Sequence, residues 1–167
     1  MSHDGSTAGC EPHSERVAIV TCDAGRTGSE IAAALAKWDW AIVLVYLDDQ
    51  TAVEAVVAEI LAADGRIVAV RADLADELDV ERLFAEATAM FGAVEVVVHS
   101  TDKSPVLLYR HASRHLRRGG VIVTVLAGDD CPPDITERLD EQGVSIRCAP
   151  HEGVLAFLRR WQQPALE

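Results

Sequence analysis

A chain of 167 residues, 49% of them hydrophobic, can bury one sizeable core and is short for two domains. Its 27 acidic and 15 basic residues give a net charge of -12, which repels nucleic acid phosphates and anionic membrane surfaces. We therefore expect neither a nucleic acid nor a membrane partner. The sequence predicts a single domain over residues 16–167, preceded by a flexible tail at residues 1–15.

The sequence also predicts the cellular compartment of the protein and the redox state of its cysteines. The tail has no apolar segment that could serve as a signal peptide, and the longest apolar runs are strand-sized. The 4 cysteines are widely separated and form no CxxC pair, so free thiols are expected, without a disulfide framework or zinc ribbon. A cytoplasmic location is predicted.

Strand-length runs rich in Val and Ile alternate with segments of helical period, the pattern of a parallel sheet covered on both faces. We expect strands at 16–21, 41–47, 66–72, 94–99, 120–126 and 144–148. We expect helices at 29–38, 51–63, 79–91, 105–118, 134–141 and 153–161. Gly65 and Gly92 are expected to end the second and third helices at positive φ. Right-handed crossovers then predict an α/β, Rossmann-like, doubly wound sheet of about six strands in the order 3-2-1-4-5-6.

Four sequence stretches carry a family resemblance. They are the strand at 17–21, the helix-opening loop that ends in Gly28, the segment Val-Arg-Ala-Asp-Leu at 70–74, and Glu-Val-Val-Val-His-Ser at 95–100. In order and spacing they resemble the short-chain dehydrogenase/reductase family. The resemblance covers most of residues 16–126, so it implies a nucleotide-binding fold for nearly the whole domain.

The loop after the first strand departs from the family pattern. The family's TGxxxGxG glycines let backbone N–H groups approach a pyrophosphate at a helix N-terminus. Cys22 and Arg26 stand at two of the glycine positions, Gly28 matches, and Gly25 is one place out of register. These residues are the candidate phosphate contacts. Because two glycines are replaced, we expect no bound cofactor, and weakened NAD(H) binding is the alternative.

Two aspartates complete the candidate nucleotide site. The resemblance implies that Asp73, after the third strand, contacts adenine. Asp48, after the second strand, could bind a ribose diol, and a solvated turn aspartate is an equally good interpretation.

The catalytic residues of the family are missing. The resemblance implies a serine after the fifth strand and a Tyr-x-x-x-Lys helix, whose lysine lowers the tyrosine pKa for proton transfer. Ala127 stands at the serine position, and Tyr46 and Tyr109 are followed four residues later by Gln50 and Ser113. Conventional carbonyl reduction is therefore not expected.

Other titratable groups gather where the strands should end. His99, after the fourth strand, is the candidate base, and Asp102, Asp129 or Asp130 could orient its imidazole. The favoured alternative is a hydrogen-bonded histidine at a strand end, because single histidines predict catalysis poorly. Adjacent aspartates in a loop are usually solvated, so no metal site is predicted.

Two predicted helices have opposite charges. The basic side chains of 105–118 are Arg110, His111, Arg114, His115, Arg117 and Arg118, and the acidic side chains of 134–141 are Asp134, Glu137, Asp140 and Glu141. The family resemblance implies that these helices form a two-fold interface, so we expect a homodimer. A solvated basic face is the alternative.

Two functions fit these observations. The first is a catalytically degenerate short-chain dehydrogenase relative that acts as a dimeric scaffold for a small molecule or protein partner. The second is a repurposed non-redox enzyme, an isomerase, cyclase or dehydratase, that uses His99 and the carboxylates at the strand ends. A truncated structural subdomain, like those that accompany polyketide ketoreductases, also fits the shortened architecture.

Overall fold

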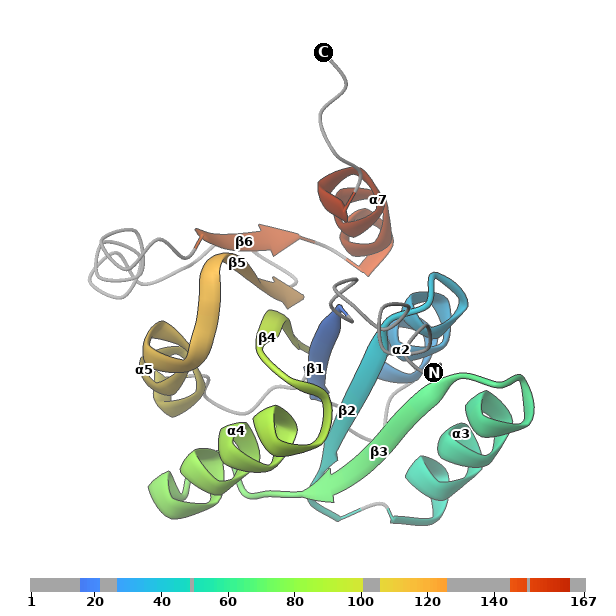
Figure 1. The fold of residues 1–167 in the computed structure, drawn as a ribbon, viewed down its shortest axis with the longest axis horizontal. Coiled ribbons are helices and arrows are strands. Elements are labelled where there is room, and N and C mark those ends of the chain that lie inside the picture. Colours follow the sequence, from blue (N-terminus) through green and yellow to red (C-terminus); the bar gives the residue numbers. More distant parts are fainter. Residues whose placement is uncertain are drawn as a thin grey trace, which may run out of the picture.

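The computed structural model describes residues 16–21, 27–48, 50–100, 106–125, 145–149 and 151–162 (Figure 1). The strands are β1 (Val17–Thr21), β2 (Ala41–Tyr46), β3 (Arg66–Arg71), β4 (Val94–His99), β5 (Leu116–Val125) and β6 (Ser145–Ala149). The helices are α2 (Thr27–Lys37), α3 (Gln50–Ala62), α4 (Glu77–Phe91), α5 (Val106–His115) and α7 (His151–Gln162). Most predicted elements are therefore present within two residues of their expected ends.

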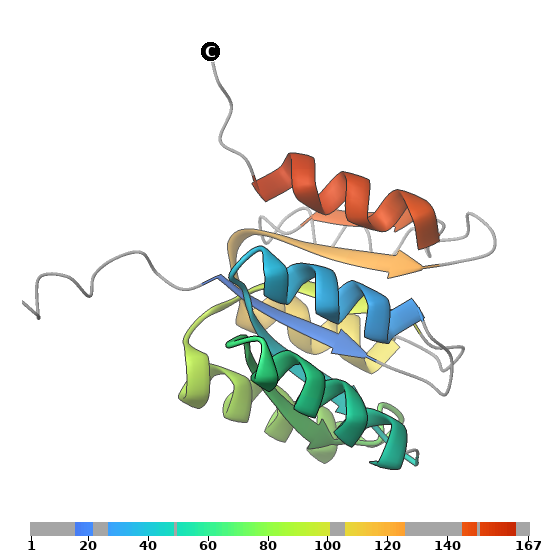
Figure 2. The same ribbon diagram turned by 90° about the vertical axis from the view of Figure 1, so that its right-hand side faces the viewer.

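The strands form one sheet in the order β3-β2-β1-β4-β5-β6, and neighbouring strands in it are parallel. The predicted order is confirmed. Helices α2, α3 and α7 pack on one face of the sheet, and α4 and α5 pack on the other (Figures 1 and 2). The structure is thus the doubly wound arrangement expected from the alternation of strands and helices.

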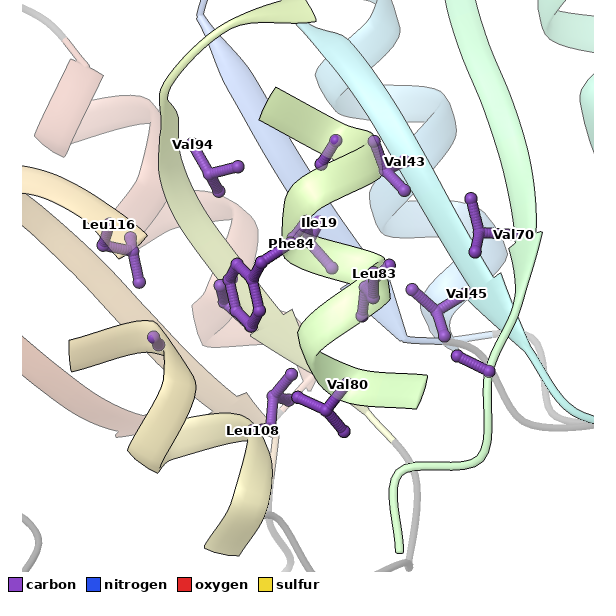
Figure 3. Packing of buried hydrophobic residues seen from close by; sticks show 14 of the residues in the cluster. Ile19, Val43, Val45, Val70, Val80, Leu83, Phe84, Val94, Leu108 and Leu116 are labelled. Carbon is purple, nitrogen blue, oxygen red and sulfur yellow. The ribbon is translucent and has the colours of Figure 1, made fainter. Parts of the chain in front are cut away.

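The central strands are buried on both faces, which explains their nearly continuous apolar sequences. All residues of β1 and of β4 are buried. Successive side chains enter different cores: Ile19 packs beneath α4 and α5, and Val20 packs beneath α2 and α7. Figure 3 shows the first core, in which Phe84 and Leu83 of α4 lie over Ile19 and Val43.

Side-chain and backbone caps set the limits of α4. The Asp76 carboxylate accepts a hydrogen bond from the backbone N–H of Leu78 at 3.0 Å, which satisfies one free donor of the first turn. Gly92 has φ 107° and donates its N–H to the Thr88 carbonyl at 2.9 Å, so its predicted role is confirmed.

None of the described helices is both long and apolar enough to cross a membrane.

Helix α5 is shorter than the helix predicted at 105–118. It ends at His115 rather than at residue 118, and β5 begins at once with Leu116, so the strand expected from residue 120 starts four residues earlier. Leu116 is buried and pairs with Val94 of β4, which draws this segment into the sheet. Arg117 and Arg118 therefore belong to a strand. The acidic helix expected at 134–141 lies outside the described residues.

The turn after α3 uses its glycine differently from the prediction. The positive φ belongs to Asp64, at 68°, whereas Gly65 donates its N–H to the Ile60 carbonyl at 2.9 Å. A Cβ atom on Gly65 would lie 2.5 Å from Ile60 Cγ2 and 3.1 Å from the Ile60 carbonyl oxygen. The glycine is therefore needed because the turn packs closely on α3.

We expect Gly65→Ala to lower the free energy of unfolding by about 1–3 kcal/mol, because the added methyl group must displace a β-branched side chain and the backbone. Urea unfolding followed by circular dichroism measures the change. Asp64→Asn is the matched control, since asparagine tolerates positive φ. Equal stability of Gly65→Ala and the wild type would contradict the close contact.

Candidate functional site

Three polar residues lie side by side where the central strands end. Thr21 is the last residue of β1, His99 is the last residue of β4, and Thr124 of β5 pairs in register with His99. The pairing of Val20 with Val98 places Thr21 beside His99. We call Thr21, His99 and Thr124 the polar row; each is at most 2% exposed. The polar row lies at the switch point of the sheet, between β1 and β4, where open α/β sheets bind ligands.

Hydrogen bonds tie the first two members of the row together. His99 Nδ1 lies 3.2 Å from Thr21 Oγ1, and the Ser100 N–H donates to the same Oγ1 at 2.9 Å. The Ser100 hydroxyl also donates to the Thr21 carbonyl at 2.6 Å. The Thr21 hydroxyl donates to the Val98 carbonyl at 3.5 Å, so an imidazole with its proton on Nδ1 can donate to Thr21 Oγ1. His99 thus has the buried, hydrogen-bonded strand-end environment of the favoured alternative.

The third member of the row is hydrogen-bonded to a tyrosine that sequence reasoning passed over. The Tyr109 hydroxyl of α5 pairs with Thr124 Oγ1, and both side chains are buried. Burial raises the pKa of Tyr109, and the hydrogen bond from Thr124 only partly opposes this shift. Tyr109 therefore stays neutral at physiological pH. In the sequence, Tyr109 stands beside Leu108 on the apolar face of a predicted helix. A tyrosine hydroxyl buried there needs a hydrogen-bond partner, and this requirement could have pointed to the contact.

Three of the candidate nucleotide-binding residues are described, and each lies at or next to the end of a helix or strand. Gly28 is buried in the first turn of α2, and Asp48 is exposed just after β2. Asp73 follows β3; its carboxylate accepts from the Ala75 N–H at 3.0 Å, and its own N–H donates to Asp79 at 3.0 Å. Asp48 and Asp73 lie at the same end of the sheet, because β2 and β3 pair in register. The structure thus holds Asp73 in a tight turn.

The remaining candidates lie outside the described residues. They are Cys22, Gly25, Arg26, Asp102, Asp129 and Asp130. Among the residues that are described, no group of three or more histidine, cysteine or acidic side chains could hold a metal ion. Within the described residues, His99 is next to hydroxyl groups. Its pairing with Asp102, Asp129 or Asp130 remains a prediction, because these residues lie outside the described part of the chain.

A doubly wound parallel sheet with polar groups at its switch point defines a protein of the Rossmann-like class. The family model described as short chain dehydrogenase matches residues 16–128, and the chain belongs to that family. An uncharacterised oxidoreductase of Methylorubrum extorquens is 29% identical over an alignment that covers 66% of this chain and 54% of that protein. The chain spans about half the length of the curated relatives it matches.

Solved structures have the same fold. A dehydrogenase/reductase from Sinorhizobium meliloti superposes with a TM-score of 0.66 at 25% identity, covering 80% of this chain and 70% of that one. A Burkholderia cenocepacia structure, described as a dehydrogenase with bound NADP, gives a TM-score of 0.67 at 20% identity and covers 89% and 74% of the two chains. The second likeness shows a shared fold alone.

Proposed function

We propose that this chain is a catalytically degenerate short-chain dehydrogenase relative that binds a small molecule or a protein without redox turnover. One observation carries the proposal: Tyr109 has no lysine four residues later, and its hydroxyl is bound to Thr124 inside the core. Proton transfer by tyrosine needs a lowered pKa, and burial shifts the pKa of Tyr109 upward. Tyr109 is thus poorly suited to donate the proton that carbonyl reduction requires.

The proposal includes a homodimer in the cytoplasm. Arg110 and Arg114 are exposed on α5 and give this helix a basic face, whose charge would complement an acidic helix. The segment at 134–141 supplies suitable acidic residues in the sequence. The charge complementarity of the two segments supports self-association through them.

Calorimetric titration with NAD, NADH, NADP and NADPH, together with the solution mass, tests the proposal. We expect a dimeric mass, no hydride transfer to carbonyl compounds, and dinucleotide binding weaker than about micromolar. The variant with Cys22→Gly and Arg26→Gly restores the two motif glycines and should tighten binding without creating turnover. Reductase turnover by the wild type would contradict the proposal. Micromolar binding of NAD would instead indicate a cofactor-dependent function.

The second candidate is a non-redox enzyme that uses His99 with the carboxylates at the strand ends. The observation that favours it is the position of the polar row at the switch point of the sheet, where open α/β sheets bind ligands. His99→Ala separates the two functions. A scaffold would keep its partner binding in this variant, whereas an enzyme would lose turnover.

A further inference from the structure

Strand β3 lies at one end of the sheet, and its outer edge has no partner among the described strands (Figure 1). Its sequence, Arg-Ile-Val-Ala-Val-Arg, has four apolar residues between two arginines. Three of the four are β-branched and favour strands. An open apolar edge is a template for pairing with another chain, so native proteins protect such edges. The side chains around β3 show how this edge is protected.

The hydrogen bonds to β2 determine which backbone groups of β3 face outward. The N–H of Ala72 donates to the Tyr46 carbonyl at 3.0 Å, so the backbone groups of residue 72 point toward β2. Because this direction alternates along a strand of a parallel pair, the backbone groups of Ile67, Ala69 and Arg71 point away from the sheet. These three residues therefore carry the donors and acceptors that an added strand would use.

Arg82 of α4 occupies one of these outward acceptors. Its guanidinium donates to the Arg71 carbonyl at 2.8 Å. The carboxylates of Asp79 and Glu86, one turn away on either side along α4, lie 3.6 Å and 3.8 Å from the same guanidinium. A guanidinium carries donors and no acceptor, so it offers nothing to the N–H of an approaching strand. Arg82 thus caps the carboxyl end of the β3 edge.

The two arginines at the ends of β3 are bonded back to the chain segments that flank β2. Arg66 donates to the Asp39 carbonyl at 2.7 Å, and Arg71 donates through Nε to the Leu47 carbonyl at 3.1 Å. These bonds keep a positive charge at each end of the apolar run. Charged residues in such positions oppose pairing between the edges of two sheets. The edge is therefore flanked by charge at both ends, and one of its acceptors is capped.

We propose that β3 is a pairing surface for a second copy of this chain, which Arg82 keeps closed. Two β3 strands can pair antiparallel about a two-fold axis at Ala69, because the outward groups then match and Ile67 of each copy faces Arg71 of the other. In this arrangement each Ile67 N–H needs the Arg71 carbonyl, the acceptor that Arg82 occupies. The inference goes beyond the proposed function, since it concerns a different surface from helix α5.

Sedimentation equilibrium of the whole chain over a range of concentrations, with Arg82→Gln beside the wild type, tests the proposal. Arg82→Gln removes the cap and should tighten self-association about tenfold, the effect of about 1.4 kcal/mol. Arg160→Gln is the matched control, because it removes the same charge from α7, which packs on β5 and β6. Association of Arg82→Gln equal to that of the wild type, or an equal increase in Arg160→Gln, would overturn the proposal.

A second change, on β3 itself, shows whether the new contact uses this edge. Ala69→Pro removes an outward N–H and keeps the bonds to β2, since edge strands tolerate proline where the N–H faces outward. Combined with Arg82→Gln, it should restore the wild-type mass. Should the double variant fail to fold, hydrogen exchange of Arg82→Gln at low and high concentration makes the same test, because the amides of β3 should exchange more slowly on association. Association that persists in the folded double variant, or that leaves β3 exchange unchanged, would overturn the proposal.

Discussion

Replacement of Phe84 by alanine should lower the free energy of unfolding by about 3–5 kcal/mol, the usual cost of removing a buried phenylalanine. Phe84 is among the largest fully buried side chains of the protein. Its ring fills the space between α4 and the sheet (Figure 3). It also stacks on His115 of α5. Neighbouring apolar side chains from two helices and the sheet would have to move to close the cavity, so little relaxation is expected.

Urea unfolding monitored by circular dichroism measures this loss, and Met90→Ala is the matched control. Met90 is on the same helix and is 55% exposed, so its truncation should change stability by no more than about 0.5 kcal/mol. Similar losses in the two variants would mean that Phe84 is not a central core residue.

The second large effect is expected from Tyr109 and Thr124. Tyr109→Phe leaves the buried hydroxyl of Thr124 without its partner, and Thr124→Val does the same to Tyr109. Each single change should cost about 1–3 kcal/mol, because a buried polar group loses its hydrogen bond. The double variant should be more stable than the sum of the single losses implies, since neither hydroxyl then remains.

A double-mutant cycle on unfolding free energies measures this coupling, which we expect to be about 0.5–3 kcal/mol. Because the Tyr109 hydroxyl is tied to the polar row, the cycle also tests whether α5 is anchored to β5 at this point. Additive losses would show that the two hydroxyls act independently.

The sheet was predictable because its central strands are buried on both faces. The apolar runs of β1, β2 and β4 identify them as strands of a parallel sheet, and the handedness rule for crossovers then gives the strand order. The boundary between α5 and β5 was not predictable in the same way. Leu116 suits a helix or a strand equally well, and its pairing with Val94 decides the outcome.

The position of His99 at the end of a strand was predictable, but its surroundings were not. Its hydrogen-bond partner Thr21 lies 78 residues away in the sequence and becomes a neighbour only through the pairing of β1 with β4. The contact between Tyr109 and Thr124 depends on how α5 is rotated against the sheet. Sequence patterns fix which residues a helix buries and leave open which polar groups meet.

The strand order also has a consequence for how the polypeptide folds during synthesis. Pairs β1–β2 and β2–β3 each join segments separated by a single helix, so the first three strands can assemble as soon as they have been made. Pairing of β1 with β4 must instead close a long loop, which costs entropy before it gains contacts. Until β4 emerges from the ribosome, β1 is an open apolar edge in the nascent chain. During this interval the unpaired edge of β1 can pair with another chain, which is a general route to aggregation.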